Sequence, residues 1–410
     1  MKKGRTTATQ LTRRQMVAAA GAAASLPVAA SPVLAVQPSG AAERSLRVEE
    51  LALTSVRVSE RTAWMFVHLH TNLGLSGLGE CSLGNRRELP ALNDAFEAAR
   101  GRSPFDIEAY RSAGRALAAT GSIFETTAFS AIEQALWDLV GKAVDAPVHQ
   151  LAGGRLRENL PAYANINRVT RERTPAAFAA NARAAVAEGF TAIKAAPFDG
   201  FPTLDAPASE VAAAADLGVA CVEAIRGAVG PDVDILIDCH SFFDVDLAIE
   251  IAGRLEPQDL AWYEEPVAPT DVAATKAIER GIEQRMAGGE FLFGIEGFGP
   301  LCREQAVDVI MPDVKHCGGL HEARKIAAVA ELDGVAVSPH NPSGPVATAA
   351  SAQLCAGLPN FEILEMQWGE AAWRGDLVEP PERFENGSIA VPERPGLGVE
   401  LNDSVVRQHA

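Results

Sequence analysis

Residues 234–240 read DILIDCH, an apolar run that ends in Asp238, Cys239 and His240. A short aliphatic run of this kind predicts a buried β-strand. Ionisable side chains are rarely buried without a partner, because removing a charge from water costs several kcal/mol. The aspartate and the histidine at this strand end therefore require something nearby that offsets the cost.

Similar apolar runs recur from about residue 160 onward and alternate with Ala-rich helical stretches, which is the pattern of βα units. The expected strands are LPAYANI, TAIKAAPF, DILIDCH, LAWYEEPV, QRMAGGE, AVDVIMPDV, VAVSPHN and NFEILEM. The expected helices are Pro175 to Glu188, Glu210 to Val229, Asp244 to Leu255, Asp271 to Glu279, Leu320 to Leu332 and Gly344 to Cys355. Eight strands with helices between them predict an α/β fold with a TIM-type barrel.

A polar residue stands at or near the C-terminal end of most of these strands. The residues are Lys194, Asp238, Glu264, Glu290, Asp313, His340 and Glu365. From Asp238 onward they are 23 to 27 residues apart, which is one βα unit per step. Isolated acids at strand ends often cap the following helix. Six residues in phase are better explained by one shared site, because the C-terminal ends of the strands meet at one barrel mouth.

Asp238, Glu264 and Glu290 come from consecutive strands, so their carboxylates are expected to lie close together. Their mutual repulsion requires a positive centre. Oxygen ligands favour Mg²⁺, with Mn²⁺ as an alternative, over zinc or copper, which prefer nitrogen or sulfur. A bound cation would also account for the buried Asp238. His240 is expected to point the same way as Asp238, because side chains alternate along a strand.

Six motifs together resemble the enolase superfamily, in the acid-sugar (galactonate-type) dehydratase branch of its mandelate racemase and muconate lactonizing enzyme family. The motifs are LIDCH, WYEEP, AGGE, MPDVKHCGG, SPHNPSGP and LEMQW. The resemblance implies a (β/α)7β-type TIM barrel with an α+β capping domain formed by the N-terminal region and the C-terminal segment. The implied divisions are 44–155 for the capping domain, 156–375 for the barrel and 376–410 for the segment that returns to the cap.

The resemblance also implies roles for the polar strand ends. It makes Asp238, Glu264 and Glu290 the metal ligands. It pairs Asp313 with His340 as a dyad in which the carboxylate orients the imidazole, and it makes His340 the general base.

Two more residues of this set receive implied roles. Glu365 would hydrogen-bond the substrate carboxylate as charge develops, and His240 would act as general acid. The implied reaction is the Mg²⁺-dependent dehydration of a sugar acid through an enediolate, which gives a 2-keto-3-deoxy acid. The proton next to a carboxylate is a very weak acid, so its removal requires that the enediolate charge be stabilised. A histidine base suits neutral pH, because its unperturbed pKa is about 6.5.

One departure from the family pattern bears on the reaction. Racemases and cycloisomerases of the family carry a Lys-x-Lys pair on the second barrel strand, whereas this chain has Lys194-Ala195-Ala196. The missing second lysine favours dehydration over a two-base reaction. Lys194 remains a candidate for catalysis, for substrate binding or for holding Glu265. A racemase, epimerase or cycloisomerase acting through the same enediolate is the alternative, and a non-catalytic sugar-acid binding protein is a further one.

Other basic residues are candidates for substrate binding. Lys315 lies two residues past Asp313 and is expected to share its strand face. The resemblance implies two capping loops over the barrel, at about 59–64 and 80–88. Arg61, Arg86 and Arg87 in these loops are candidates for clamping a carboxylate or hydroxyls.

Composition and charge limit the partners. Asp and Glu number 53 against 36 Lys and Arg, a formal charge of -17. This balance argues against nucleic acid as a partner. A small-molecule sugar acid is the expected partner, and the resemblance suggests a homo-oligomer. Six scattered cysteines without a CxxC motif predict buried free thiols, with neither a disulfide framework nor a Cys metal site.

The N-terminus has the pattern of an export signal. A basic stretch with Arg13-Arg14 precedes a short apolar run of small residues that ends near Ala35. The run is too short to span a bilayer, and the paired arginines resemble a twin-arginine signal. We therefore expect residues 1–35 to be removed and the mature protein to be periplasmic and free of the membrane, with a cytoplasmic location as the alternative.

Overall fold

The computed structural model describes residues 45–60, 62–83 and 88–410. The export signal predicted for residues 1–35 and the candidates Arg61, Arg86 and Arg87 lie outside the described residues. All the elements below belong to one compact unit of the chain. Within the described residues, we find no helix with both the length and the apolarity that crossing a membrane requires.

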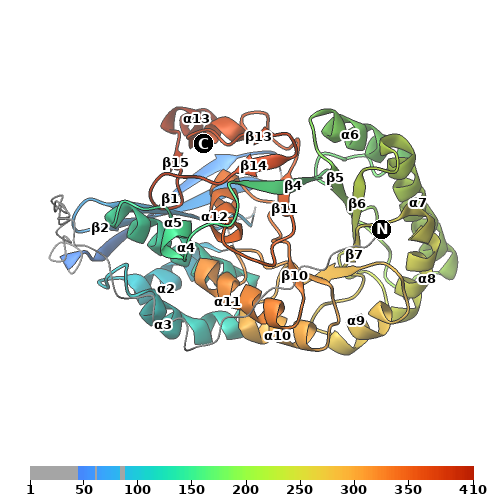
Figure 1. Ribbon diagram of the computed structural model, residues 1–410, viewed down its shortest axis with the longest axis horizontal. Coiled ribbons are helices and arrows are strands. Elements are labelled where there is room, and N and C mark those ends of the chain that lie inside the picture. Colours follow the sequence, from blue (N-terminus) through green and yellow to red (C-terminus); the bar gives the residue numbers. More distant parts are fainter. Residues whose placement is uncertain (1–44, 61, 84–87) are drawn as a thin grey trace, which may run out of the picture. The chain divides into compact units, whose positions relative to one another are not determined.

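Eight parallel strands form the predicted barrel (Figure 1). They are β4 (Asn159–Asn165), β5 (Ala192–Ala195), β6 (Asp234–Asp238), β7 (Trp262–Glu264), β8 (Met286–Gly288), β9 (Val309–Ile310), β10 (Ala336–Val337) and β11 (Leu364–Gln367). Neighbours pair in chain order from β4 to β10, and β11 lies beside β4. The ring closes where Val337 of β10 bridges to Phe361, just before β11. The predicted TIM-type barrel is confirmed.

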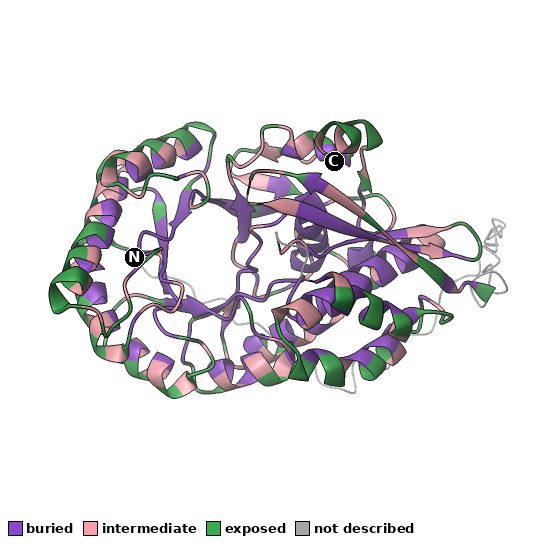
Figure 2. Cartoon of the chain, turned by 180° about the vertical axis from the view of Figure 1, so that it is seen from behind, coloured by how far each residue is buried: buried purple, intermediate pink, exposed green. Residues whose placement is uncertain are grey.

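Seven helices follow the strands and lie outside the ring (Figure 1). They are α6 (Pro175–Ala187), α7 (Ala208–Val229), α8 (Val245–Leu255), α9 (Val272–Glu279), α10 (Gly294–Arg303), α11 (Gly319–Leu332) and α12 (Pro345–Cys355). The short 3-10 helix η1 (Glu256–Gln258) follows α8. Apolar residues three or four positions apart, such as Ala248, Ile251 and Leu255 in α8, form the buried face of each helix (Figure 2).

Side-chain alternation along β6 separates the two layers of the barrel. Ile235 and Ile237 belong to the core between the strands and the helices. Leu236 lies in the smaller core inside the ring, together with Trp262 of β7. Asp238 is two residues past Leu236, so it shares the inward direction and reaches the barrel mouth. The strand pattern therefore places an apolar layer inside the barrel and a charged layer at its C-terminal end.

The N-terminal part forms a separate antiparallel sheet with helices packed against it. Its strands are β1 (Val48–Arg57), β2 (Ala63–Thr71) and β3 (Ser76–Glu80), paired in that order. Its helices are α2 (Leu89–Ala99), α3 (Ile107–Thr120), α4 (Ile123–Ala143) and α5 (Val148–Leu151). The helix α4 starts with a capping box, in which Ser122 and Glu125 bond each other's backbone N–H groups. This α+β unit confirms the predicted capping domain.

The C-terminal segment contacts both parts of the molecule. Its elements are η2 (Arg374–Leu377), β12 (Val378–Glu379), β13 (Phe384–Glu385), β14 (Ser388–Ala390), β15 (Glu400–Leu401) and α13 (Asp403–His409). The strand β14 pairs antiparallel with β4 of the barrel, and α13 contacts β1 of the cap. The exact divisions at 155 and 375 stay a prediction.

Three buried carboxylates join these parts, and we call Glu80, Glu133 and Asp138 the interface carboxylates. Glu80, at the end of β3, accepts hydrogen bonds from the backbone N–H groups of Gly344 (2.7 Å) and Ala347 (2.9 Å) at the start of α12. A carboxylate at a helix N-terminus satisfies donors that have no partner within the helix. The cap thus holds the first turn of the last barrel helix.

Glu133, on α4, does the same for α11. It accepts hydrogen bonds from the N–H groups of Leu320 (2.7 Å) and His321 (2.9 Å) and from the indole of Trp137 (2.9 Å). Burial raises the pKa of Glu133 to about 7, although these donors and Arg111 oppose the shift.

Asp138, also on α4, ties the cap to the C-terminal segment. It accepts hydrogen bonds from the N–H groups of Leu78 (2.8 Å) and Leu397 (2.7 Å), and Lys142 lies 2.7 Å away. Burial raises the pKa of Asp138 to about 6, against the effect of Lys142. Each interface carboxylate is therefore surrounded by donors that the fold itself supplies.

Candidate active site

Three carboxylates meet at the barrel mouth, and we call Asp238, Glu264 and Glu290 the mouth carboxylates. One oxygen of each lies within 4.8 Å of one oxygen of the other two, and all three side chains are buried. Asp238 and Glu264 are register partners on β6 and β7, and Glu290 follows β8. The structure thus brings together the three residues that the sequence predicts as metal ligands.

Lys194 is the cation closest to this group. Its Nζ lies 2.5 Å from Glu264, 3.1 Å from Asp238 and 3.8 Å from Glu365. The predicted alternative that Lys194 holds Glu265 is therefore wrong, because its ion pairs go to the neighbouring glutamate. Glu265 has left-handed backbone (φ 39°), and its side chain accepts hydrogen bonds from Gly289 and Glu290 N–H groups instead.

Burial and mutual repulsion disfavour the charged form of two of the three mouth carboxylates. Burial and the neighbouring Asp238 raise the pKa of Glu264 well above its ordinary value. Burial also raises the pKa of Glu290, and Asp238 adds to the effect. Only Asp238 has a lowered pKa, because Lys194 and His240 outweigh its burial. A divalent cation among the three carboxylates would relieve this repulsion, so the donor set fits a hard ion such as Mg²⁺.

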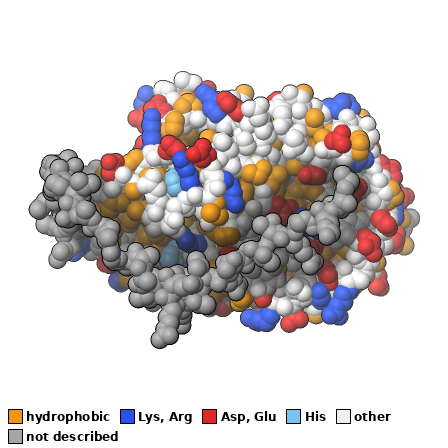
Figure 3. All heavy atoms as spheres, viewed as in Figure 1, with side chains coloured by type: hydrophobic (Ala, Val, Ile, Leu, Met, Phe, Trp, Pro, Cys, Tyr) orange, Lys and Arg blue, Asp and Glu red, His pale blue; other side chains and the backbone are white. Residues whose placement is uncertain are grey.

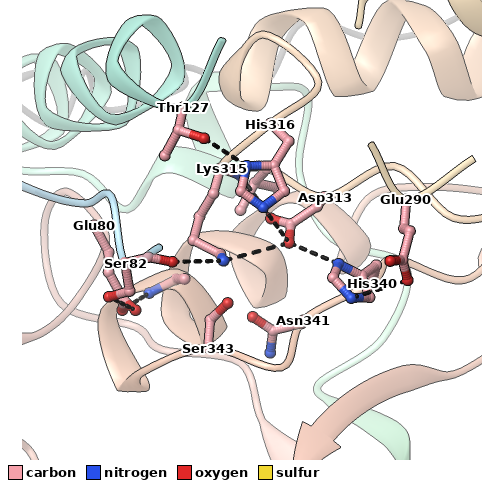
Figure 4. Close-up of polar contacts among 12 residues, drawn as sticks. Glu80, Ser82, Thr127, Glu290, Asp313, Lys315, His316, His340, Asn341 and Ser343 are labelled. Carbon is pink, nitrogen blue, oxygen red and sulfur yellow. Dashed lines mark hydrogen bonds and ion pairs between the residues drawn. The ribbon is translucent and has the colours of Figure 1, made fainter. Parts of the chain in front are cut away.

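The predicted dyad lies beside Glu290, one of the mouth carboxylates (Figure 4). His340 Nδ1 is 2.8 Å from Asp313 Oδ2, and His340 Nε2 is 3.1 Å from Glu290 Oε2. Burial disfavours ionisation of Asp313, but Lys315, His316 and His340 outweigh it and lower its pKa. An ionised carboxylate can only accept, so His340 Nδ1 donates the proton and Nε2 faces the site.

Lys315 and His316 surround the same aspartate. Lys315 Nζ lies 3.6 Å from Asp313 Oδ2 and donates to the backbone carbonyl of Ser82 in the cap (3.4 Å; Figure 4). The prediction that Lys315 shares a strand face with Asp313 is wrong, because β9 ends at Ile310 and Lys315 is not on a strand. A turn brings it there instead.

Glu365 on β11 faces the mouth from the opposite side of the ring. Asn165 of the neighbouring strand β4 donates to its Oε1 (2.6 Å), and the Asn341 N–H donates to its Oε2 (2.8 Å). Burial is outweighed by Lys194 and His340, so the pKa of Glu365 is lowered. Its side chain is therefore ionised and fixed between β4 and the loop after β10.

His240 lies at the mouth, although the expected reason is wrong. The strand β6 ends at Asp238, so strand alternation does not orient His240. Its backbone is left-handed (φ 46°), as is that of Ser241 (φ 59°), an unusual conformation for residues with a side chain. This turn places His240 Nε2 3.2 Å from Asp238 Oδ2. Two adjacent strained residues at this point are typical of a functional site.

Sequence reasoning missed Asp199, the second partner of His240. Asp199 Oδ1 lies 2.5 Å from His240 Nδ1. Burial lowers the basicity of His240, but Asp238 and Asp199 outweigh it and raise its pKa to about 11. Asp199 is four residues past the end of β5, in a loop where no periodicity points to it.

A cavity of about 400 Å³ opens onto these side chains. Candidates predicted from the sequence that line it are Lys194, Asp238, His240, Glu290, Lys315 and His340. Further lining residues, which the sequence did not single out, are Trp64, Asn165, Asn167, Arg168, Phe291 and Gln367. A polar, partly enclosed cavity of this size accommodates a small polyhydroxylated acid. All six cysteines are buried and free, as predicted.

Figure 3 shows the charged side chains on one face of the described residues. On the described atoms visible in Figure 3, basic and acidic side chains are interspersed and the basic ones form no continuous patch. This distribution agrees with the net charge of -17.

Comparison with known proteins identifies the family of both parts. The N-terminal domain of the mandelate racemase / muconate lactonizing enzyme family matches residues 43–153, and the family described as enolase C-terminal domain-like matches residues 177–405.

Individual relatives are similar over most of the chain. D-xylonate dehydratase of Haloferax volcanii is 34% identical over 88% of this chain and 90% of that enzyme. D-galactarolactone cycloisomerase of Agrobacterium fabrum is 32% identical over 84% of this chain and 90% of that enzyme. The crystal structure of a mandelate racemase/muconate lactonizing enzyme from Sulfitobacter sp. superposes with a TM-score of 0.80 at 31% identity and covers 89% of this chain and 96% of that one.

Dehydratases of D-gluconate and D-galactonate are also among the relatives. The chain is therefore a lyase, and it belongs to the mandelate racemase and muconate lactonizing enzyme family of the enolase superfamily, in the acid-sugar dehydratase branch.

Proposed function

We propose that this enzyme dehydrates a sugar acid in a Mg²⁺-dependent reaction that gives a 2-keto-3-deoxy acid. The observation that carries the proposal is the mouth carboxylates facing the Asp313–His340 pair across a polar cavity. The dehydratases among the relatives support the reaction class.

Asp238, Glu264 and Glu290 would hold the cation, since their oxygens are the closely grouped hard donors at the barrel mouth. When bound, the ion supplies positive charge that lowers the energy of the enediolate formed from the substrate carboxylate. The negative charge on Glu264 and Glu290 is otherwise poorly compensated, as their raised pKa values indicate.

Proton abstraction falls to His340. Asp313 holds Nδ1, so the second nitrogen, Nε2, is directed into the site and is available to take the proton from the carbon next to the carboxylate. Positioned general bases contribute about 10²- to 10⁴-fold to rate. Glu365, fixed by Asn165 and Asn341, would hydrogen-bond the substrate carboxylate as charge develops on it.

Loss of the neighbouring hydroxyl falls to His240. It lines the cavity from the Asp238 side, whereas His340 lines it from the Glu290 side. An acid and a base on different sides of the bound substrate suit an elimination, in which a proton leaves one carbon and a hydroxyl leaves the next.

A screen of sugar acids tests the proposal. We expect one or more to yield a 2-keto-3-deoxy acid with Mg²⁺ and none after chelation of the metal. His340→Asn should lower the turnover at least about 10²-fold. Full activity in the chelated enzyme, or in His340→Asn, would contradict the proposed mechanism.

A cycloisomerase or racemase is the second candidate, because one relative is a cycloisomerase at a similar level of identity. The ion pairs of Lys194 with three carboxylates argue against its use as a second base. Conversion of a lactone or an epimer without water loss in the same screen would favour this candidate.

The location is proposed on the N-terminal sequence alone. The paired arginines before a short apolar run support export to the periplasm, as a partial match to a twin-arginine signal. N-terminal sequencing of the mature protein tests it: an intact residue 1 in the purified native protein would favour the cytoplasm.

A further inference from the structure

The barrel mouth contains a second aspartate–histidine pair besides Asp313–His340. Asp199 Oδ1 lies 2.5 Å from His240 Nδ1, and the other nitrogen of the ring, Nε2, lies 3.2 Å from Asp238 Oδ2 on the cavity side. The arrangement repeats that of the first pair: a carboxylate at Nδ1 and a mouth carboxylate near Nε2. The pairs differ in exposure, since the His240 side chain is 35% exposed and that of His340 is 9% exposed.

Asp199 is itself held in place by the loop after β4. Asn167 donates to Asp199 Oδ2 (2.8 Å), and Arg173 lies 3.1 Å from the same oxygen. Arg173 also donates to the backbone carbonyls of Asn167 (3.2 Å) and Thr170 (3.3 Å), and its guanidinium stacks over Phe178. One oxygen of Asp199 is thus anchored to the fold, and the other is left to bind the His240 ring.

We propose that Asp199 is a positioning residue that holds the His240 ring with Nε2 directed at the leaving hydroxyl, so that it serves water loss and not proton abstraction. The inference rests on the proposed function. A histidine ring on a strained turn, with about a third of its surface exposed, has rotamers open to it that a carboxylate bound to Nδ1 excludes. An orienting partner of this kind typically contributes about 10- to 100-fold, as known for residues that orient metal ligands.

The step that Asp199 would support balances as follows. After His340 has taken the proton from the carbon next to the carboxylate, the enediolate electrons form a double bond to the neighbouring carbon. The C–O bond of that carbon breaks, and its electron pair leaves with the oxygen. The oxygen takes the proton from His240 Nε2 and departs as water. The resulting enol tautomerises to the 2-keto acid.

The test separates the two halves of the reaction in Mg²⁺-loaded enzyme in D₂O. Dehydration is measured from the 2-keto-3-deoxy product, and proton abstraction from deuterium that enters the recovered substrate next to the carboxylate. The variants are Asp199→Asn, His240→Asn and the double variant. Asp205→Asn is the matched control, because it makes the same change at an exposed position in the same loop.

Asp199→Asn should slow dehydration about 10- to 100-fold while deuterium exchange stays within about threefold of wild type. His240→Asn should lose more dehydration activity than Asp199→Asn, again with little change in deuterium exchange. The double variant should dehydrate the substrate no more slowly than His240→Asn alone. The Mg²⁺ affinity of Asp199→Asn should match that of wild type. The control Asp205→Asn should match wild type in both dehydration and deuterium exchange. In NMR spectra, the His240 Nδ1 proton signal should be lost in Asp199→Asn.

Two results would overturn the inference while the proposed function stands. One is unchanged dehydration in Asp199→Asn, and the other is an equal fall of exchange and dehydration, which would indicate a merely structural role. If wild type dehydrates no sugar acid, the proposed function fails and the inference fails with it.

Discussion

The interface carboxylates and the mouth carboxylates are equally buried but have opposite surroundings. Glu80, Glu133 and Asp138 each accept hydrogen bonds from two backbone N–H groups. The mouth carboxylates face one another, and they form ion pairs, Asp238 and Glu264 with Lys194 and Glu290 with His340. Burial of an acid alone therefore does not identify a functional site. The difference lies in how fully the fold supplies donors: Asp238 accepts from one backbone N–H, that of His240 (3.0 Å), and Glu264 accepts from the indole of Trp262 (3.0 Å). One oxygen of each mouth carboxylate also lies within 4.8 Å of the other two acids.

The strongest test of this comparison is the loss of one mouth carboxylate. Glu290→Gln should lower dehydration about 10³-fold or more, because it removes a metal ligand and the acidic contact of His340. The metal-free variant should be at least as stable as metal-free wild type, because like-charge repulsion is relieved. Steady-state turnover and urea unfolding measure the two effects. A large loss of stability with normal turnover would reverse the assignment.

Loss of an interface carboxylate should instead lower stability and leave turnover nearly unchanged. Asp138→Ala should lower the free energy of unfolding by about 4 kcal/mol, because it leaves two buried N–H groups without their acceptor and removes one of the acidic partners of Lys142. Turnover per folded molecule should stay near wild type. Urea unfolding with parallel activity assays checks this, with the exposed Glu97→Ala as control.

Stability should depend on pH through Glu133. Its folded pKa of about 7 lies above the ordinary value of 4.5, so its contribution is fully present below about pH 4.5 and is lost as the pH rises through 7. The full shift corresponds to about 3 kcal/mol. Unfolding free energies of wild type and Glu133→Gln, measured from pH 4.5 to 8, should differ by a margin that falls with rising pH. A margin that is constant or rises would exclude this effect.

The smallest expected effect is stabilisation by Mg²⁺. At a free concentration of about 100 times its Kd, the ion should raise the free energy of unfolding of wild type by about 2.7 kcal/mol. It should also stabilise Asp138→Ala by this amount, and it should stabilise Glu290→Gln much less. Thermal unfolding with and without Mg²⁺ measures the difference, and equal stabilisation of all three proteins would place the ion elsewhere.

Most of the fold could be predicted because short apolar strands alternate with helical stretches. The polar residues at the strand ends also recur once in each βα unit. The helix α10 was not predicted, because Gly294, Gly297, Gly299 and Pro300 make its sequence unlike a helix. Its buried face, which includes Phe298 and Leu301, supplies the stabilisation that the local sequence lacks.

The site could be predicted only where a residue stands at a strand end. Asp238 and Glu264 follow from strand alternation and register. Asp199 and the turn at His240 depend on loop conformations that no periodicity encodes. The interface carboxylates were missed for a related reason: Glu133 is one acid among many on helices, and only its tertiary donors distinguish it.

At two places the backbone comes very close to an interface carboxylate. The only sign of this in the sequence is a glycine. A methyl group on Gly319 would lie 2.1 Å from Glu133 Oε2, and one on Gly396 would lie 2.1 Å from Asp138 Oδ1. Both glycines also have positive φ, of 86° and 74°. Any larger residue there would push the carboxylate away from the N–H groups that it serves.

The ammonium group of Lys194 has a consequence for how the protein matures. Lys194 extends from β5 and pairs with the acids of β6 and β7. The chain therefore supplies its own positive charge to the acidic end of the barrel. If the proposed cation binds there, the barrel mouth does not depend on it alone for positive charge, and metal binding could follow folding as a separate event.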